Sequence, residues 1–200
     1  TRAYLEAADQ AGLGTSTDYN SGDMDGATLY QIATKGGFRA SAARGYLRPA
    51  RRRSNLNVQT KAHVARVLLA DKRAVGVEYM QDGQSKTARV RGEVILCGGA
   101  INSPQLLQLS GIGPTHVLKH CTIPVVHDAA QVGRNLKDHL GCDLYFRSRV
   151  PTLNQQLRPL LGKLMVGLQY LLTRKGPLSL SLNQGGGFVR MSEQSEGPDV

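Results

Sequence analysis

The stretch at residues 94–114, VILCGGAINSPQLLQLSGIGP, decides how the rest of this sequence is interpreted. Its apolar run at 94–97 is short and begins with two β-branched residues, which predicts a buried strand over 93–97. Gly98 and Gly99 follow and carry no side chains at the point where the predicted strand ends. Bare backbone at the end of a strand allows a flat or anionic ligand to approach the main chain closely.

The residues after this glycine pair predict a short helix. Ser103 can cap the free amides of the first turn, and Pro104 suits the first helical position. Ser110 and Gly111 predict the end of the helix, because glycine readily adopts the left-handed conformation that closes one. The chain has no GxGxxG or GxxxxGK[ST] pattern, so this turn alone does not define a nucleotide site.

The chain has 200 residues and a net charge of +10, with many of its basic residues in the first half. A nucleic-acid binder would interleave this charge with aromatic residues, but only Phe38 and Tyr46 lie near it. We therefore interpret the charge as a solvated surface and predict no nucleic-acid partner. The length allows one or two domains. The sequence begins inside a helical pattern and ends in a turn, which predicts an internal piece of a longer protein.

Cys97, Cys121 and Cys142 lie too far apart for a metal site or a disulfide framework. They predict buried free thiols in a reducing, cytoplasmic compartment, and no metal. The longest apolar stretch, 160–172, is too short to span a bilayer, which takes about 20 apolar residues. Its leucines recur at helical spacing and predict a face that packs within the protein rather than a membrane contact.

Local patterns predict the remaining elements. Asp82-Gly83 lies between two alternating runs and predicts a β-hairpin. The three glycines at 185–187 follow an alternation of Leu and Ser, which fits either a strand that approaches a ligand or a plain bulge. The predicted helices cover 2–11, 40–47, 114–120 and a segment from Pro151 to Gly176, and the predicted strands cover 57–60, 62–70, 74–80, 86–91 and 93–97.

Several motifs together resemble those of the glucose–methanol–choline (GMC) oxidoreductases. The segment GGAINSPQLLQLSGIGP at 98–114 is similar to the second signature of that family. VGRNLKDH at 132–139 is similar to a loop that follows the signature, and RPARRRSNLNVQTKAHVARVLLADKRAVGVEY at 48–79 resembles the region before it. The motifs occur in the family's order over nearly the whole chain.

The resemblance implies an α/β (α+β) flavoenzyme. Its Rossmann-like FAD-binding domain is intertwined with a substrate domain built on an antiparallel sheet, and both are expected to be incomplete here. The FAD part is expected at 55–143 and the substrate part at 1–54 and 144–200. The family's phosphate-binding GxGxxG and its catalytic base are expected to lie before and after this chain, so no catalytic residue is assigned within it.

The resemblance also implies binding residues. Val64 is expected to contact the adenine of FAD through its backbone, and Gly98, Gly99 and Ala100 are expected to form the bare turn beside the cofactor. Asn183 and Gln184 are expected to face the substrate.

Choline-oxidising relatives carry glutamate where this chain has Gln184, so the resemblance implies an uncharged alcohol as the substrate. His139 follows Asp138 within the VGRNLKDH loop. We interpret this histidine as structural, because adjacent side chains rarely face each other.

The implied reaction is the oxidation of an alcohol. A base takes the hydroxyl proton while the carbinol carbon gives a hydride to the flavin. The sequence does not indicate the electron acceptor. Two alternatives stay open: a flavin-containing hydroxynitrile lyase of the same family, and a basic binding module without catalysis.

Overall fold

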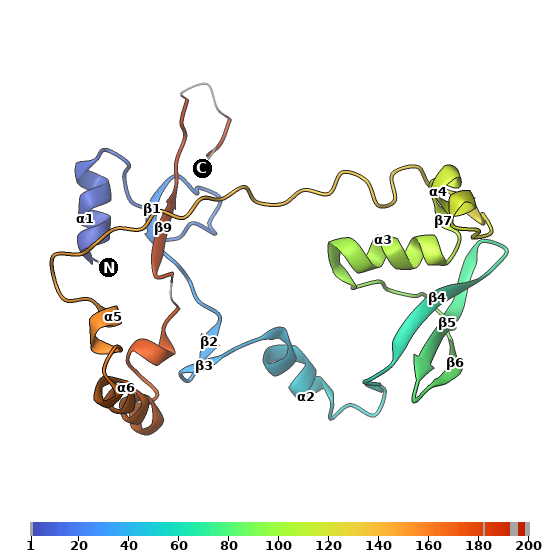
Figure 1. The fold of residues 1–200 in the computed structure, drawn as a ribbon, viewed down its shortest axis with the longest axis horizontal. Helices are drawn as coiled ribbons and strands as arrows, with labels where there is room; N and C mark the ends of the chain where they lie inside the picture. The colour runs from blue at the N-terminus through green and yellow to red at the C-terminus, as the bar shows by residue number, and fades with distance from the viewer. Residues whose placement is uncertain (1, 182, 193–195, 199–200) are drawn as a thin grey trace. The chain divides into compact units, whose positions relative to one another are not determined.

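The computed structural model describes residues 2–181, 183–192 and 196–198 (Figure 1). Helices and short strands are both distributed along the described chain, which confirms the mixed α/β class. The described strands form small separate sheets, and the largest has three strands. A continuous Rossmann-like sheet is therefore not present among the described residues.

The chain divides into two compact units. One unit combines Thr1–Leu56 with Tyr145–Val200, and the other is Asn57–Leu144. Each unit is described by itself below. Their assignment to substrate and cofactor binding stays a prediction.

An antiparallel sheet of three strands forms the centre of unit Asn57–Leu144. Its order is β4-β5-β6, and consecutive strands are joined by tight turns. Asp82 and Gly83 both have positive φ, 52° and 75°, so the predicted hairpin at this dipeptide is confirmed. Residues 57–60, a predicted strand, have no strand structure, because none of their backbone groups joins this ladder. The three strands are β4 (His63–Ala70), β5 (Arg73–Gln81) and β6 (Gln84–Arg89).

Helix α3 (Gly99–Leu109) packs against β4 and begins earlier than the sequence predicts. Its N-cap is Gly98, so the prediction that Ser103 caps the helix is wrong. Pro104 lies inside the helix rather than at its first position. Gly99 has a φ of +80°, and this conformation lets the chain turn into the helix without a capping side chain.

The predicted strand at 93–97 is also wrong. Among the described residues, this segment forms no strand and pairs with none. Ile95 is 76% exposed, so the apolar run is not buried here. A strand needs a hydrogen-bonded neighbour, and a local apolar pattern does not say where that neighbour comes from.

The end of α3 leads into a small parallel pair of strands. Ser110 is the C-cap, and Gly111 has a φ of +84°, which confirms the predicted end of the helix. Strand β7 (Ile112–Gly113) then pairs with β8 (His127–Asp128), and α4 (Thr115–His120) lies between them. The predicted helix at 114–120 is thus confirmed. The Thr115 backbone N–H donates to Asp128 at 3.0 Å, and hydrogen bonding from Thr115 lowers the pKa of the Asp128 carboxyl.

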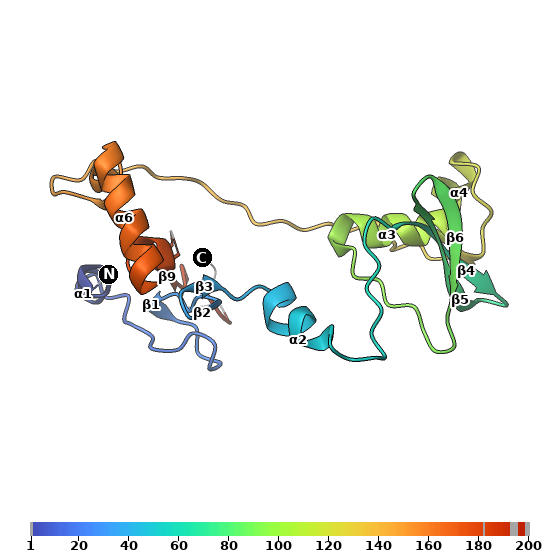
Figure 2. The same ribbon diagram turned by 90° about the horizontal axis from the view of Figure 1, so that it is seen from below.

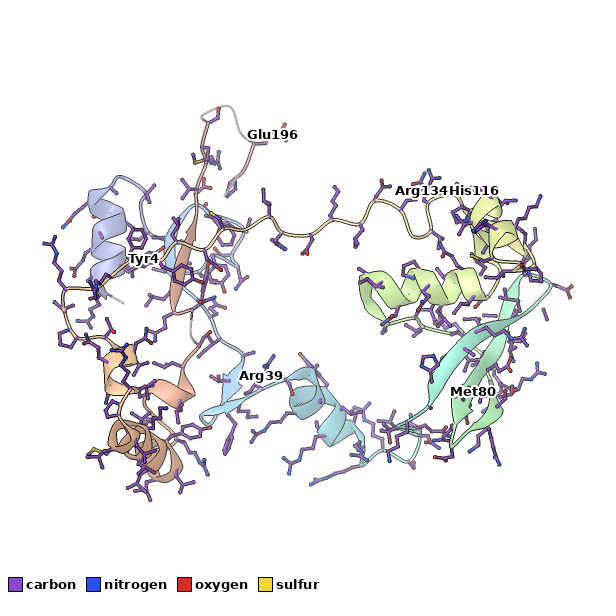
Figure 3. All side chains as sticks on the ribbon, in the orientation of Figure 1. Tyr4, Arg39, Met80, His116, Arg134 and Glu196 are labelled. Carbon is purple, nitrogen blue, oxygen red and sulfur yellow. The ribbon has the colours of Figure 1, made fainter. Side chains whose placement is uncertain are left out.

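The unit of Thr1–Leu56 and Tyr145–Val200 contains an antiparallel pair, β1 (Gly26–Leu29) and β9 (Gly185–Phe188). Figures 1 and 2 show these strands side by side, although they come from distant parts of the sequence. The glycines of β9 make room for aromatic side chains. A Cβ on Gly185 would lie 3.0 Å from the ring of Tyr4, which Figure 3 labels beside this strand.

The other elements of this unit are short, except for one helix. The predicted helix at 40–47 is a π-helical turn followed by a helical turn that contains Pro49, so the predicted end at residue 47 is wrong. The predicted helix from Pro151 is interrupted before Leu160. The elements are α1 (Arg2–Gln10), β2 (Thr34–Lys35), β3 (Phe38–Arg39), η1 (Ala43–Leu47), α2 (Arg48–Ala50), α5 (Leu153–Gln156), α6 (Leu160–Thr173) and η2 (Pro177–Ser179).

Two predictions about burial are wrong for the described residues. All three cysteines are free, as expected, but they are exposed, because they lie in or beside segments outside the packed elements. The leucine stripe of α6 is exposed rather than packed. Within the described part of the chain, no helix has the length and apolar character needed to cross a membrane.

Candidate functional site

A cavity of about 650 Å³ lies in unit Asn57–Leu144, between the start of β4, segment 94–98 and helix α3. Val64 and Gly98, two of the residues that the family resemblance selects, both line it. Most of its other lining residues are aliphatic, and they include Val77, Ile95 and Leu106. The structure thus brings a strand and a glycine turn, far apart in sequence, to one apolar groove.

Val64 lies on an edge of the described sheet. Strand β4 has β5 on one side only, so part of its backbone is free of ladder hydrogen bonds. A register irregularity falls between Val64 and Arg66, and such a bulge turns neighbouring backbone groups away from the ladder. An edge valine beside a bulge can offer backbone N–H and C=O groups to a ligand in the groove.

Gly98 is the N-cap of α3, and Gly99 and Ala100 are the first two residues of this helix. No side chain caps this helix at Gly98, so the amides of its first turn have no side-chain partner there. A Cβ on Gly98 would lie 3.1 Å from the Cβ of Asn102, which leaves little room for any larger residue. Ala100 lines a second cavity rather than the groove that contains Val64.

Ser110 joins α3 to β4 and is nearly buried, at 8% exposure. Its hydroxyl donates to the Leu106 carbonyl at 2.6 Å and accepts the Val67 backbone N–H at 2.8 Å. This bridge fixes the helix against the edge strand that carries Val64. The sequence marks Ser110 only as the end of a helix, because nothing local indicates a partner 43 residues away.

Gln108 joins α3 to the loop that carries the VGRNLKDH motif. Its Nε2 donates to the Val132 carbonyl at 3.2 Å. A Cβ on Gly133 would lie 2.8 Å from Nε2, and a Cβ on Gly113 would lie 2.9 Å from the Gln108 Cγ. The two glycines therefore make the space that Gln108 occupies, a relation that the spacing of the motifs does not indicate.

The second cavity, of about 520 Å³, lies between α3 and this loop. Ala100 and Pro104 line it from the helix, and Arg134, Asn135 and Lys137 line it from the loop. Two of these loop residues, Arg134 and Lys137, are cationic, so the cavity has positive charge on the side opposite the helix. Gln108 also lines this cavity, and its hydrogen bond to Val132 joins the helix to the loop.

We predict that Gln108→Leu lowers the free energy of unfolding of the full-length protein by about 1 kcal/mol, because the Val132 carbonyl loses its donor. Urea unfolding measures this change. Gln105→Leu is the matched control, since Gln105 lines the same cavity and is exposed. An equal effect of the two variants would show that the Gln108 hydrogen bond contributes nothing.

The histidine of the motif does not form a side-chain pair with its neighbour. The backbone N–H of His139 donates to the Asp138 carboxylate at 2.8 Å. His116 and Arg134, both labelled in Figure 3, instead line a further cavity with Lys119 and Asp128. The described His, Cys, Asp and Glu side chains form no group of three or more that could bind a metal ion.

The predicted substrate residues lie in the other unit. Asn183 and Gln184 are exposed and directly precede β9. The Gln184 carbonyl accepts the Tyr30 backbone N–H at 3.1 Å, so its main chain is held while its side chain faces solvent. Their role in substrate binding stays a prediction.

Comparison with known proteins identifies the class. Residues 1–141 match the family described as GMC oxidoreductase. This match covers more than half of the sequence, and the chain belongs to the GMC oxidoreductase family. The resemblance inferred from the motifs is thereby confirmed.

Particular relatives share this class. The chain is 40% identical over 200 residues to an oxygen-dependent choline dehydrogenase of Chromohalobacter salexigens, covering 100% of this chain and 36% of that protein. It is 36% identical over 203 residues to an alcohol dehydrogenase [acceptor] of Pseudomonas putida, covering 100% of this chain and 37% of that protein. The crystal structure of a formate oxidase matches with a TM-score of 0.82 and 28% identity, over 94% of this chain and 33% of that chain. The chain thus spans little more than a third of the length of these curated relatives.

Proposed function

We propose that this chain is part of an FAD-dependent oxidoreductase that acts on the CH–OH group of an alcohol. The observation that carries this proposal is the groove that Val64 and Gly98 share, within a chain of the GMC family. The named relatives include choline and alcohol dehydrogenases, which supports an alcohol as substrate. A reducing, cytoplasmic location is part of the proposal and rests on the three free thiols.

The described residues fit the adenine end of FAD. A flat aromatic ring requires an apolar slot with a few backbone hydrogen-bonding groups, and the groove offers aliphatic walls beside an edge strand. Gly98 presents bare backbone on one wall, so no side chain blocks the approach of the ring.

Each part of this chain would have a separate task. The Val64 backbone would hold the adenine, Gly98 and Gly99 would let the main chain come close, and Ser110 would fix both walls of the groove. When bound, FAD would accept the hydride that leaves the carbinol carbon, and this hydride carries both electrons of the oxidation. The aliphatic walls of the groove would exclude water from the bound ring.

Anaerobic addition of alcohols to the purified full-length protein tests this function. We expect a yellow protein whose flavin absorbance is bleached by a substrate alcohol. A yellow protein that alcohols do not bleach, but that cleaves a cyanohydrin, would indicate a hydroxynitrile lyase instead. A colourless protein that does not take up added FAD would indicate a binding module without catalysis.

We further propose that the substrate is an uncharged alcohol rather than choline. Glutamate at the position of Gln184 would attract a quaternary ammonium group, whereas the amide of Gln184 offers hydrogen bonds without a negative charge. The strongly basic balance of the chain adds no attraction for a cation. We predict a higher kcat/KM for neutral alcohols than for choline.

We predict that Gln184→Glu shifts the ratio of kcat/KM for choline to that for a neutral alcohol toward choline by about tenfold or more, because the added negative charge attracts the quaternary ammonium group of choline. Steady-state kinetics of the full-length enzyme measure this ratio. Asn183→Asp adds the same charge one residue away and is the control. The assignment of Gln184 fails if both variants shift the ratio equally or neither does.

A further inference from the structure

The backbone groups on the outer edge of β4 decide what this edge can bind. The Val67 N–H donates to the Ser110 hydroxyl at 2.8 Å, so this amide points away from β5 and toward α3. In a regular antiparallel strand, the backbone hydrogen-bonding groups of successive residues point to alternate edges. Val64 lies three residues before Val67, so in a regular strand its N–H and C=O would face β5.

An extra residue changes this alternation between the two valines. Val64 pairs with Tyr79 and Arg66 pairs with Glu78, so Ala65 is the additional residue of the bulge. A bulge of one residue shifts the alternation by one position. Val64 therefore presents its N–H and C=O on the same outer edge as the Val67 N–H, at the groove that Val64 lines.

Ser110 holds this outer edge through a hydroxyl whose orientation is fixed. Its proton is donated to the Leu106 carbonyl at 2.6 Å, so its oxygen accepts, rather than donates, at β4. Val67 and Ser110 are both buried, and a buried amide without a partner is costly. The hydroxyl therefore keeps α3 and the outer edge of β4 at one separation.

We propose that Ser110 is a positioning residue that sets the Val64 edge to select adenine as the base of the dinucleotide. The proposal rests on the proposed function, because it concerns the ring that the groove would hold. The outer edge at Val64 places one backbone donor beside one backbone acceptor. Adenine offers the complementary pair, since its N1 accepts and its 6-amino group donates. Hypoxanthine reverses both groups, because its N1–H donates and its O6 accepts.

Reconstitution of the flavin-free full-length protein with two dinucleotides tests the proposal. The probes are FAD and its hypoxanthine analogue, which differ only in the purine base, and flavin fluorescence measures the Kd of each. We expect the wild type to bind FAD more than about tenfold tighter than the analogue, because a site built for one hydrogen-bond pattern leaves its groups unpaired with the other. Ser110→Ala is expected to bring the ratio of the two Kd values close to one.

Ser85→Ala is the matched control, because it removes a hydroxyl from the same sheet. The Ser85 hydroxyl, on β6, donates to the Glu78 carboxylate at 2.8 Å, and neither residue is among the described residues that line the groove. This variant is expected to keep the wild-type ratio. A loss of stability alone weakens the binding of both dinucleotides by the same factor, so the ratio separates positioning from folding.

Ser110→Cys is a second variant, since a thiol keeps a side chain at this place but accepts hydrogen bonds weakly. An intermediate ratio is expected. The positioning role is overturned if Ser110→Ala weakens the binding of both dinucleotides equally, or if neither Ser110 variant folds, because the hydroxyl then serves only the fold. A wild type that binds FAD and its analogue equally well also overturns it, and the proposed function then stands. A wild type that binds neither dinucleotide contradicts the proposed function as well.

Discussion

Gly111→Ala is expected to destabilise the full-length protein by about 3 kcal/mol or more. The residue has a φ of +84°, where an L-side chain is strained. Its new Cβ would also lie 2.5 Å from the Pro124 carbonyl oxygen and 2.8 Å from a methyl group of Val126. Both neighbours belong to the segment that leads into β8, so the overlap cannot be relieved by one flexible side chain. Urea unfolding of the two proteins measures the loss.

Gly92→Ala is the control for this prediction. A Cβ on Gly92 would have no neighbouring atom within 4 Å, and the φ of this residue is not positive. Its replacement is expected to change the free energy of unfolding by less than about 0.5 kcal/mol. If both variants lower the free energy of unfolding equally, the close packing at Gly111 does not contribute to stability.

Gly99→Val is expected to lower the flavin content of the full-length enzyme about tenfold. A β-branched residue at a φ of +80° costs a few kcal/mol, so the start of α3 must shift and with it the Gly98 wall of the groove. No atom lies within 4 Å of a Cβ at Gly99, so the effect comes from backbone strain and not from an obstructed turn. The ratio of flavin to protein absorbance in the folded fraction measures it.

Gly83→Val is the matched control for flavin binding. Gly83 has a φ of +75° and equally open surroundings, but it lies in the turn between β5 and β6. The same backbone strain there is expected to lower stability and leave the flavin content of the folded protein unchanged. If the folded protein loses flavin in both variants, the effect is not specific to Gly99 and the prediction is wrong.

Local signals account for the parts of the fold that the sequence predicts correctly. The Asp82-Gly83 turn and the end of α3 at Gly111 depend on backbone conformations that few residues adopt. The predicted strand at 93–97 fails because pairing is not local: the pattern gives an apolar run, and Ile95 is left 76% exposed. The start of α3 fails for a related reason, since a glycine turn at Gly98 replaces the serine cap.

The candidate site is only partly predictable from sequence for the same physical reason. Val64 and Gly98 come from the family resemblance, and the structure adds that they line one groove. The contacts that shape this groove are long-range. Ser110 meets the Val67 amide and Gln108 meets the Val132 carbonyl, and neither partner follows from the periodicity of α3.

Amide hydrogen exchange of the full-length protein, with and without bound FAD, tests the central claim most directly. The claim is that the groove between Val64 and Gly98 holds the adenine end of the cofactor. Bound FAD is expected to slow exchange at 62–64 and in the first turn of α3, and to leave the hairpin at Asp82 unchanged. Protection confined to other segments, with exchange at Val64 and Gly98 unaltered by FAD, would contradict the claim.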